Sequence, residues 1–389
     1  MTRQVAIVGS GPAGLLLGHL LRQAGLDAVI VERHCAEHVL SRIRAGVLEA
    51  TATDQLVRLG LDQRMNEEGL LHAGVNLTDG ERMLRIDLAG LTGKKVMVYG
   101  QTEVTKDLIE AAPERGLEIV WDAEDVALHD IETDTPHLTF TKNGAEQRID
   151  ARFIAGCDGF YGPSRQAIPD TVGQNCELVY PFGWLGILSD VPPCNEELIY
   201  ANHERGFALA SMRSHTRSRY YIQVPIDTEL EDWPDEKIWD ELETRFGPEV
   251  AATIERGPSI EKSIAPLRSF VFEPMRHGSL LLAGDAAHIV PPTGAKGLNL
   301  AASDVAYLAE ALVAFFDKGE ERGIDQYSDR ALARVWKSER FSWYLTNLMH
   351  RFPDAGTFER RMQVAELQYI ASSRAAQAAI AENYVGLPL

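Results

Sequence analysis

The sequence predicts an α/β fold in which a parallel-sheet unit is interrupted by β-rich segments and followed by a helical C-terminal part. Three observations predict it. A continuous apolar run at 5–8 leads through a glycine-rich turn into a helical segment at 12–24 and a second apolar run at 28–31, as in a βαβ unit. Alternating, aromatic-rich segments fill much of 181–225, which is typical of antiparallel strands. From Asn299 almost to the C-terminus, the composition is helical.

Further elements follow from the same patterns. An apolar run at 280–283 predicts another buried strand. Amphipathic composition predicts helices at 47–60, 102–115, 235–245 and 249–255. Grouped by position, the elements predict a discontinuous α/β domain (1–70, 98–178 and 264–335), a β-rich domain (71–97 and 179–263) and a C-terminal helical region (336–389).

Composition limits the partners and the compartment. The 389 residues carry a formal net charge of −19, which argues against nucleic acid and anionic membranes because both need a basic surface. The four cysteines show neither CxxC nor metal-type spacing, so no metal site is expected and reduced thiols fit best. We find no signal peptide and no apolar run long enough to span a bilayer. The sequence therefore predicts a soluble, cytoplasmic protein.

A glycine-rich turn, GSGPAG at 9–14, lies between the first predicted strand and helix. Gly9 permits the tight turn, Gly11 lets the backbone approach a pyrophosphate, and Gly14 lets the helix and strand pack closely. The N-terminus of the helix then presents N–H groups to the phosphates. Glu32, which ends the second strand, is placed to accept hydrogen bonds from ribose hydroxyls. This pattern predicts a dinucleotide site without choosing between a flavin and a nicotinamide.

Two more glycine-bearing loops follow strand-like runs. Asp158 and Gly159 follow one run, and Gly284 and Asp285 follow another, ahead of a predicted helix. The Asp285 carboxylate could bind the ribityl hydroxyls of a flavin. Backbone donors at 294–299 could stabilise negative charge on the pyrimidine side of a reduced flavin. Together with the first loop, they favour FAD.

In this order, the three loops (GSGPAG with Glu32, then CDG, then GDAAH followed by P and GLN) resemble those of the flavoprotein aromatic hydroxylases of the glutathione-reductase fold. The resemblance covers most of the chain. It implies a tightly but noncovalently held FAD in a Rossmann-like domain. It also implies an inserted, mostly antiparallel β-sheet domain for the substrate and a helical C-terminal part.

Within that family, the chain is similar from end to end to the branch that hydroxylates 4-hydroxybenzoate. The similarity is carried by stretches that include RIRAGVLE (42–49), VYGQTEVT (98–105), TRSRYY (216–221) and AENYVGLP (381–388). It implies a FAD-dependent monooxygenase that uses NAD(P)H and O2. The reaction, through a flavin C4a-hydroperoxide, places a hydroxyl group at the 3-position and gives 3,4-dihydroxybenzoate (protocatechuate), a step of aromatic catabolism.

Three arginines lie within the short segment ASMRSHTRSRYY of this acidic chain. From composition alone, either a solvated face or a pocket for a small aromatic anion would fit. By the resemblance, Arg213 clamps the substrate carboxylate through parallel N–H···O bonds, with help from the hydroxyls of Ser211 and Tyr221. Arg219 matches a family residue near the flavin. Arg217 is expected to be solvent-exposed.

The other end of the substrate needs a device that removes a proton, because a phenolate reacts with electrophilic oxygen far more readily than a phenol of pKa about 10. The resemblance implies that Tyr200 bonds the substrate oxygen, that Tyr384 comes next in the chain, and that His72 passes the proton to solvent. Histidine suits this outer end because its ordinary pKa is about 6.5.

Other positions match family residues around the substrate ring and the flavin. Pro292 would place its carbonyl near the reacting carbon, and Trp184 and Leu198 would form an apolar wall. Lys296 would add positive charge beside the flavin. The remaining matches around the FAD or its path are Arg42, Arg44, Gln101, Asp158, Leu298 and Asn299. Arg44 also fits a flavin that swings between an inner and an outer position.

The chain has no second GxGxxG motif, which fits a family that binds its nicotinamide on the protein surface. By motif position, the candidate contacts are Arg33, His34, His38, Arg42, Phe160, Tyr161, Arg165 and Arg268. Arg33 could pair with the 2′-phosphate of NADPH, whereas Glu37 would repel it. The segment 33–38 and Tyr161 depart from the pattern of NADPH-specific relatives. NADPH is favoured, with NADH or the use of both as alternatives.

The resemblance also implies a homodimer formed through the C-terminal helices, whose aromatic residues would be core or interface: Trp336, Trp343, Tyr344 and Met349. Three alternatives stay open: a hydroxylase of another hydroxybenzoate, a dehydrogenase or oxidase on the same fold, and a non-enzymatic binding protein. The second would not explain the set of Arg213, Tyr200 and Tyr384. The third would typically have lost the FAD loops, and all three loops are intact.

Overall fold

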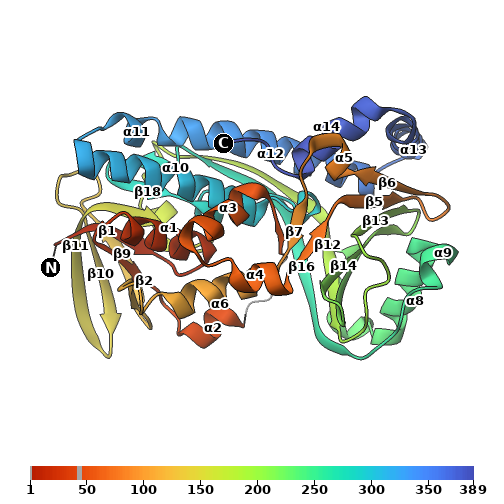
Figure 1. Cartoon of the computed structure of the whole chain (residues 1–389), viewed down its shortest axis with the longest axis horizontal. Helices are drawn as coiled ribbons and strands as arrows, with labels where there is room; N and C mark the ends of the chain where they lie inside the picture. Colours follow the sequence, from red (N-terminus) through yellow and green to blue (C-terminus); the bar gives the residue numbers. More distant parts are fainter. Residues whose placement is uncertain (1, 42–45) are drawn as a thin grey trace.

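The apolar runs of the sequence form neighbouring strands of one sheet. The computed structural model describes residues 2–41 and 46–389 (Figure 1). The strand order is β17 (Arg276–His277), β18 (Leu280–Leu282), β11 (Ala145–Gly156), β1 (Thr2–Val8), β2 (Ala28–Val31) and β8 (Glu118–Val120). From β18 to β8 the strands run parallel. β17 and the hairpin of β9 (Glu124–His129) and β10 (His137–Lys142) pair antiparallel.

Helices cover this parallel sheet. α1 (Pro12–Gln23) contacts α6 (Gln101–Ala111) and α10 (Gly297–Lys318), and α10 contacts α3 (Ala50–Leu59). α10 is long and apolar enough to cross a membrane, so the expectation that no apolar segment reaches that length is wrong. However, 67% of its most apolar window is buried inside the protein, which makes α10 a core helix. The shorter helices are α2 (Ala36–Leu40), α4 (Gln63–Glu68) and α7 (Pro163–Gln166).

The helix predicted at 102–115 ends early, at Ala111, and two other predicted helices are also shorter than the sequence indicates. At 47–60, the first two residues form β3 (Val47–Leu48) and pair with β7 (Val96–Val98), so the helix begins only at Ala50. β7 also pairs with β4 (Leu70–His72), which completes a three-stranded antiparallel sheet. The helix expected at 249–255 is α9 (Pro248–Ala251), which ends in tight turns such as the bond from Thr253 N–H to Val250 O. In both places, tertiary pairing or a turn overrides local propensity.

The β-rich part forms one eight-stranded sheet. Its order is β19 (His288–Ile289), β16 (Ser259–Glu273), β12 (Gln174–Ser189), β15 (Arg217–Pro225), β14 (Gly206–Ser214), β13 (Ile199–His203), β5 (Gly74–Thr78) and β6 (Met83–Asp87). Every pair is antiparallel except β13 with β5. Each strand therefore alternates its side chains between two faces.

The two faces of this sheet bury different partners. One face packs on α8 (Asp235–Phe246) and α9, which lie at the far edge of the molecule in Figure 1. The other face packs on the C-terminal helices α12 (Tyr327–Met349) and α14 (Arg374–Tyr384). A ligand bound on this second face would lie between the sheet and the helices, away from water.

The remaining elements join these parts. α11 (Arg322–Asp325) precedes α12, α13 (Thr357–Ser372) precedes α14, and α5 (Leu88–Thr92) contacts α14. Three short 3-10 helices lie in loops: η1 (Leu230–Asp232), η2 (Gly284–Ala286) and η3 (Pro292–Gly294). The predicted domain boundaries at 178, 263 and 335 fall inside β12, β16 and α12, all of which are continuous elements. The division into domains therefore stays a prediction.

Candidate active site

The first glycine loop has the shape that a dinucleotide requires. Gly9 adopts φ +98°, and a Cβ there would lie 2.5 Å from the Cys157 carbonyl oxygen. A Cβ at Gly14 would lie 2.0 Å from the Gly9 carbonyl oxygen, so α1 packs directly on the turn. At Gly11, by contrast, an added Cβ would meet no atom within 4 Å. The backbone is therefore open at the one glycine where a pyrophosphate would approach the N-terminus of α1.

Glu32 ends β2 beside this loop and is buried. Its Oε2 accepts hydrogen bonds from Ser10 N–H (2.8 Å) and Ser10 Oγ (3.0 Å), and its Oε1 accepts one from His34 N–H (3.0 Å). The carboxylate thus holds the loop in shape. Each carboxylate oxygen has more than one lone-pair position, so a ribose hydroxyl could still donate to it.

Replacing Glu32 by alanine is expected to weaken FAD retention tenfold or more, because the ribose acceptor and three bonds that shape the loop are lost together. The measurement is the flavin-to-protein ratio after dialysis. Glu118→Ala is the matched control, since this carboxylate lies on the neighbouring strand β8 and is half exposed. Full flavin occupancy in the Glu32 variant would contradict the ribose role.

The second loop leaves one acceptor without a partner. Asp158 Oδ2 accepts from Ser164 N–H at 2.8 Å, whereas Oδ1 is buried and has no hydrogen-bond partner among the described residues. Burial raises the pKa of this carboxyl group. Gly162 is needed here, because a Cβ would lie 2.1 Å from the Asp158 carboxyl carbon. An orphaned buried acceptor beside the glycine loop fits a ligand that donates a hydrogen bond.

The third loop places Asp285 on η2, at the carboxyl end of β18, with an exposed side chain. The loop is fixed from behind, because Asp304 Oδ2 accepts from Gly284 N–H at 2.9 Å. His288 also bonds Asp304, at 2.6 Å, and this buried carboxylate raises the pKa of the imidazole against the opposing effect of burial. Neither Asp304 nor His288 is among the residues that the sequence predicts for the site.

Beyond η3, the 22-residue helix α10 begins at Gly297. Leu298 is half-buried in its first turn, and Gln101 opens α6. Asn299 is buried and fully used, since its Oδ1 accepts from Glu49 N–H and its Nδ2 donates to the carbonyls of Val47 and Ala295. Arg42 and Arg44 lie outside the described residues. The glycine loop, the Asp158 oxygen and the α10 N-terminus therefore fit FAD, which Glu32, Asp158 and Asp285 would hold.

Strand register places the predicted substrate contacts on one face of the eight-stranded sheet. Tyr200 pairs with Leu209, Leu209 with Tyr221, and Tyr221 with Gly186 across four neighbouring strands. Ser211 lies two residues beyond Leu209 and so shares its face. Gly186 makes room, because a Cβ there would lie 2.8 Å from the Tyr221 ring. This is the face that packs on α12 and α14.

Arg213 is a cation without a counter-ion. Its Nη1 donates to Met212 O (2.9 Å) and lies 3.5 Å from Ser211 Oγ, while its Nε is buried and unbonded. It forms no ion pair with any residue that the structure describes. Burial lowers the pKa of the guanidinium, and the neighbouring Tyr221 opposes this shift. An unpaired, partly buried guanidinium is costly unless an anion joins it, so this position fits a carboxylate.

The other two arginines of the segment have partners. Arg219 is buried, with Nη1 3.1 Å from the Glu261 carboxylate and Nη2 donating to Ser263 Oγ at 3.1 Å. Its guanidinium lies over the Tyr221 ring, 5.2 Å from the centroid, and so supports that ring. Arg217 pairs with Asp190 on the surface, where 47% of its side chain is exposed. Of the three, only Arg213 is available to a ligand anion.

At the predicted phenol end, the hydroxyl oxygens of Tyr200 and Tyr384 are 3.0 Å apart and share a hydrogen bond. Both side chains are fully buried. Burial raises the pKa of Tyr200 to about 12 and also raises the pKa of Tyr384. Both groups are therefore neutral hydroxyls near pH 7, able to accept and donate a proton within one hydrogen-bonded chain.

His72 differs from the expectation in one respect. It is buried on β4, burial lowers its pKa to about 4, and neither ring nitrogen has a hydrogen-bond partner among the described residues. The imidazole is therefore neutral at pH 7, and could relay a proton only by accepting at one nitrogen while donating from the other. Because the sequence shows residue type and not burial, the ordinary pKa was the only value available from it.

The lowered pKa of His72 predicts a pH effect on stability. In the unfolded chain, the imidazole takes up a proton as the pH falls below about 6.5, whereas in the folded chain it does so only near pH 4. This contribution to stability is fully present above pH 6.5 and is lost as the pH falls toward 4, by at most about 1.4 kcal/mol per pH unit. Between pH 7 and pH 5, the free energy of unfolding measured with urea should fall less in His72→Gln than in the wild type. The exposed His215→Gln serves as the control, and equal losses in both variants would contradict the prediction.

Pro292 is exposed on η3, where its backbone can meet a ligand. Trp184 and Leu198 are buried and belong to the same apolar cluster as Tyr200. The Trp184 ring lies 5.1 Å from the Tyr221 ring, which places the predicted apolar wall beside the predicted carboxylate end.

Lys296 is held by residues that the sequence does not single out. Its Nζ donates to Glu49 Oε1 (2.5 Å) and to Tyr384 O (3.1 Å). Arg334 also reaches Glu49, at 3.4 Å, and donates to the carbonyls of Leu387 and Pro388. Burial lowers the pKa of Lys296, and Glu49 opposes that shift. This buried cluster ties the C-terminal segment that carries Tyr384 to the α10 loop.

The candidate nicotinamide contacts form two groups. The Phe160 ring contacts two guanidinium groups, those of Arg165 (4.7 Å to the centroid) and Arg268 (4.6 Å), while Tyr161 is 76% exposed beside it. Arg268 also pairs with Glu177 at 3.2 Å. In the other group, the rings of His34 and His38 lie 4.0 Å apart and Arg33 is exposed.

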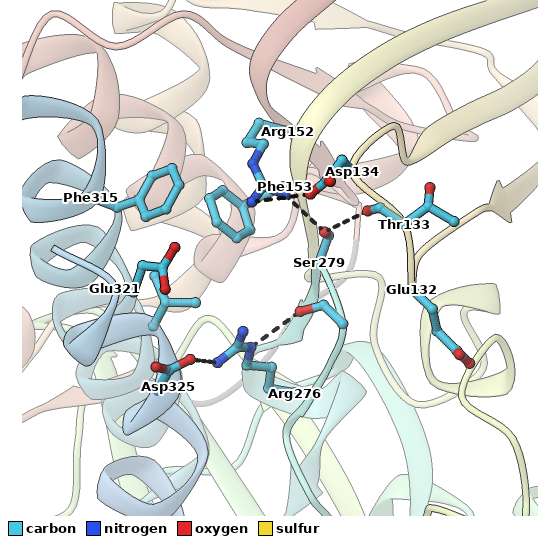
Figure 2. A pocket seen from close by; sticks show the side chains of 12 residues that line it. Glu132, Thr133, Asp134, Arg152, Phe153, Arg276, Ser279, Phe315, Glu321 and Asp325 are labelled. Carbon is cyan, nitrogen blue, oxygen red and sulfur yellow. Dashed lines mark hydrogen bonds and ion pairs between the residues drawn. The ribbon is translucent and has the colours of Figure 1, made fainter. Parts of the chain in front are cut away.

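A cavity of about 260 Å³ is lined by none of these residues (Figure 2). Four of its charged groups form two pairs: Arg276 with Asp325 (2.6 Å) and Arg152 with Asp134 (3.7 Å). Arg152 and Ser279 come before the residues at which β11 and β18 pair, so the cavity lies at the amino end of this parallel pairing. Ligands of open α/β sheets bind outside the carboxyl ends of the strands, and the three glycine loops lie there. The cavity is therefore not part of the candidate site.

The open glycine loop and the orphaned Asp158 oxygen define a dinucleotide-binding α/β protein, and the unpaired Arg213 adds a partly buried cation that could meet a small anion. The chain belongs to the FAD binding domain family, whose match covers residues 2–342. It is 57% identical to the p-hydroxybenzoate hydroxylase of Acinetobacter baylyi (strain ATCC 33305 / BD413 / ADP1), over 100% of this chain and 96% of that protein. The expected family is therefore confirmed.

Two solved structures show the same fold. The p-nitrophenol 4-monooxygenase PnpA from Pseudomonas putida DLL-E4 has a TM-score of 0.84 at 18% identity and covers 100% of both chains. The Diels-Alderase PyrE3 of pyrroindomycin biosynthesis has a TM-score of 0.78 at 22% identity, covering 99% of this chain and 81% of its own. At these identities, the likeness shows the fold alone. It confirms the predicted fold class.

Proposed function

We propose that this protein hydroxylates 4-hydroxybenzoate at the 3-position, using FAD, NAD(P)H and O2, and releases 3,4-dihydroxybenzoate (protocatechuate). The Acinetobacter relative supports the reaction through its 57% identity over the whole chain. The observation within the molecule that carries the proposal is the unpaired Arg213 guanidinium on the sheet that also carries Tyr200, whose hydroxyl pairs with that of Tyr384 on α14. A hydroxybenzoate has a carboxylate that would pair with the Arg213 cation and a phenolic hydroxyl that would bond Tyr200.

The spacing supports a substrate with one ring. Tyr200 on β13 and Tyr221 on β15 are separated by one strand, and neighbouring strands are about 4.8 Å apart, so their backbones lie roughly 10 Å apart. A benzene ring with a carboxylate at one end and a hydroxyl at the other spans such a gap once the side chains reach inward. Trp184 and Leu198 would cover the ring.

When bound, FAD takes reducing equivalents from NAD(P)H and activates O2, so that one oxygen atom enters the ring and the other leaves as water. The protein supplies binding, orientation and proton transfer. Arg213, with Ser211 and Tyr221, would hold the carboxylate. Tyr200 would accept the phenolic proton as Tyr384 takes one in turn, which makes the ring electron-rich at the carbon next to the hydroxyl. The Pro292 carbonyl would contact that carbon.

The proposed contacts of the cofactor are Gly9, Gly11, Gly14, Glu32, Asp158 and Asp285, with Gln101, Leu298, Asn299, Lys296 and Arg219 around them. For the reductant, we propose NADPH, bound through Arg33, His34, His38, Phe160, Tyr161, Arg165 and Arg268. Exposed Arg33 supports this choice because a guanidinium pairs well with a 2′-phosphate, although Glu37 beside it is unfavourable.

A cytoplasmic homodimer is also proposed. Five large apolar side chains on α12 and α13 are strongly exposed for a single chain, as expected of an interface. They are Trp336, Trp343, Phe358, Met362 and Tyr369. Analytical ultracentrifugation of the purified protein distinguishes monomer from dimer.

The test of the proposed function is the oxidation of NADPH and of NADH by the purified yellow protein, with and without 4-hydroxybenzoate. Substrate should stimulate oxidation strongly, and chromatography should show 3,4-dihydroxybenzoate in proportion to the NADPH consumed. Oxidation without hydroxylated product would overturn the proposed substrate. The same assay on other hydroxybenzoates and on aminobenzoate then defines the substrate range.

A further inference from the structure

One fully buried histidine at the end of α12 contacts the predicted substrate wall, although no motif points to it. The Nε2 atom of His350 lies 2.7 Å from Trp184 Nε1, and its Nδ1 atom lies 3.0 Å from the carbonyl oxygen of Thr346. An indole N–H can only donate and a carbonyl can only accept. His350 therefore carries its proton on Nδ1 and accepts from Trp184 through Nε2.

Aromatic stacking fixes the same ring. His350 lies nearly parallel to Phe182 (4.9 Å between centroids, 8°) and to Trp184 (5.8 Å, 8°), and 4.3 Å from Phe207. Trp184 in turn stacks on Phe207 at 4.9 Å and lies 5.1 Å from Tyr221. The imidazole is thus an interior member of the aromatic group that lines the proposed substrate site. Burial lowers its pKa to about 3, so it stays neutral and keeps this bonding pattern at pH 7.

The same turn of α12 also holds the loop that carries Pro292, whose carbonyl is proposed to contact the reacting carbon of the substrate. The Oγ1 atoms of Thr346 and Thr293 share a hydrogen bond of 2.9 Å, and Thr293 follows Pro292 on η3. Because Thr346 and His350 are one helical turn apart, a single rigid segment anchors both the Trp184 wall and the Pro292 loop. The two are separated by more than a hundred residues in the sequence.

We propose that His350 is a positioning residue that fixes the Trp184 ring against the aromatic substrate through the indole N–H···Nε2 bond. This inference rests on the proposed function, since it assigns Trp184 to the wall of the hydroxybenzoate site. An indole free to turn would leave the ring of the substrate loosely held, and product formation would then fall behind NADPH oxidation.

Two substitutions separate the hydrogen bond from the stacking. His350→Phe keeps an aromatic ring and removes the acceptor, whereas His350→Gln can restore an acceptor near the Nε2 position. His350→Phe should raise the Kd of 4-hydroxybenzoate, measured from the change in flavin absorbance, about fivefold to tenfold, the loss of a buried hydrogen bond. It should also raise the fraction of NADPH that yields peroxide. His350→Gln should recover most of both.

A double-mutant cycle with Trp184→Phe tests the route of the effect. If His350 acts through the indole, His350→Phe should change the Kd less than twofold in the Trp184→Phe background. An effect of equal size in both backgrounds would overturn the proposal. So would an unchanged Kd and peroxide fraction in the His350→Phe single variant.

The contact has a readout that needs no turnover. In a proton–nitrogen correlation NMR spectrum of isotope-labelled protein, the indole N–H signal of Trp184 is identified by its loss in Trp184→Phe. It should shift on His350→Phe and return toward its original position in His350→Gln, and an unmoved signal would overturn the bond. The two proposals can fail separately. If His350→Phe weakens the binding of 4-hydroxybenzoate but the wild-type protein forms no dihydroxybenzoate, the hydroxylase function is overturned and the positioning role is still supported.

Discussion

Replacing Arg213 by lysine is expected to raise the Kd of 4-hydroxybenzoate tenfold or more. The guanidinium has no ion-pair partner among the described residues, so its role is not to stabilise a neighbouring carboxylate. A lysine keeps the charge but loses the paired N–H donors, which should cost about 1.5–3 kcal/mol. The measurement is a titration of the oxidised protein with substrate, followed by the flavin absorbance.

The same segment supplies the control. Arg217 is two strand positions from Arg219, is paired with Asp190 and is exposed, so Arg217→Lys should leave the Kd unchanged. Arg213→Ala should weaken binding more than Arg213→Lys, because it also removes the charge. Folding should be little affected, since an unpaired buried cation is itself unfavourable. Unchanged binding in Arg213→Lys would remove the carboxylate clamp from the proposed function.

The glycine loop could be predicted from the sequence because its requirements are local. Gly9 adopts a positive φ, and Gly14 packs against the Gly9 carbonyl. Both glycines lie within one six-residue segment. The β-rich sheet and the C-terminal helices were predictable for the same reason, since periodicity is read over short windows. The start of the helix at Ala50 was not, because the pairing of Val47 with β7 comes from outside the window.

The contacts that hold the site together join distant parts of the chain. Lys296 and Glu49 are 247 residues apart in the sequence, Arg334 and Glu49 are 285 apart, and Trp184 and His350 are 166 apart. No local pattern marks such partners, and each residue type by itself is more often a satisfied core or surface side chain. The same holds for the pKa of His72, which is set by burial and not by residue type. The local sequence gives one hint: Lys296 and Glu49 are charged residues in otherwise apolar or glycine-rich stretches, which suggests that they are buried and paired.

Replacing Tyr200 by phenylalanine is expected to leave the substrate Kd within about threefold while slowing hydroxylation by roughly a hundredfold, the scale of one lost proton-transfer group. Tyr200 shares its hydrogen bond with Tyr384 and is fully buried, so the variant breaks the hydroxyl chain at the end proposed to face the substrate. NADPH oxidation should continue, with most of its reducing equivalents appearing as peroxide. Product and peroxide are measured together as a function of the NADPH consumed.

The pH dependence distinguishes proton removal from a simple packing defect. If Tyr200 helps to take the phenolic proton, Tyr200→Phe should regain product yield as the pH rises toward the phenol pKa of about 10, because the phenolate then forms without help. Tyr220→Phe is the matched control: Tyr220 is fully buried on the opposite face of the same sheet, in the cluster that packs on α8. It should change neither yield nor pH profile. A Tyr200→Phe variant with normal product yield at pH 7 would mean that the buried hydroxyl pair is structural, and the proton would then have to leave the substrate by another route.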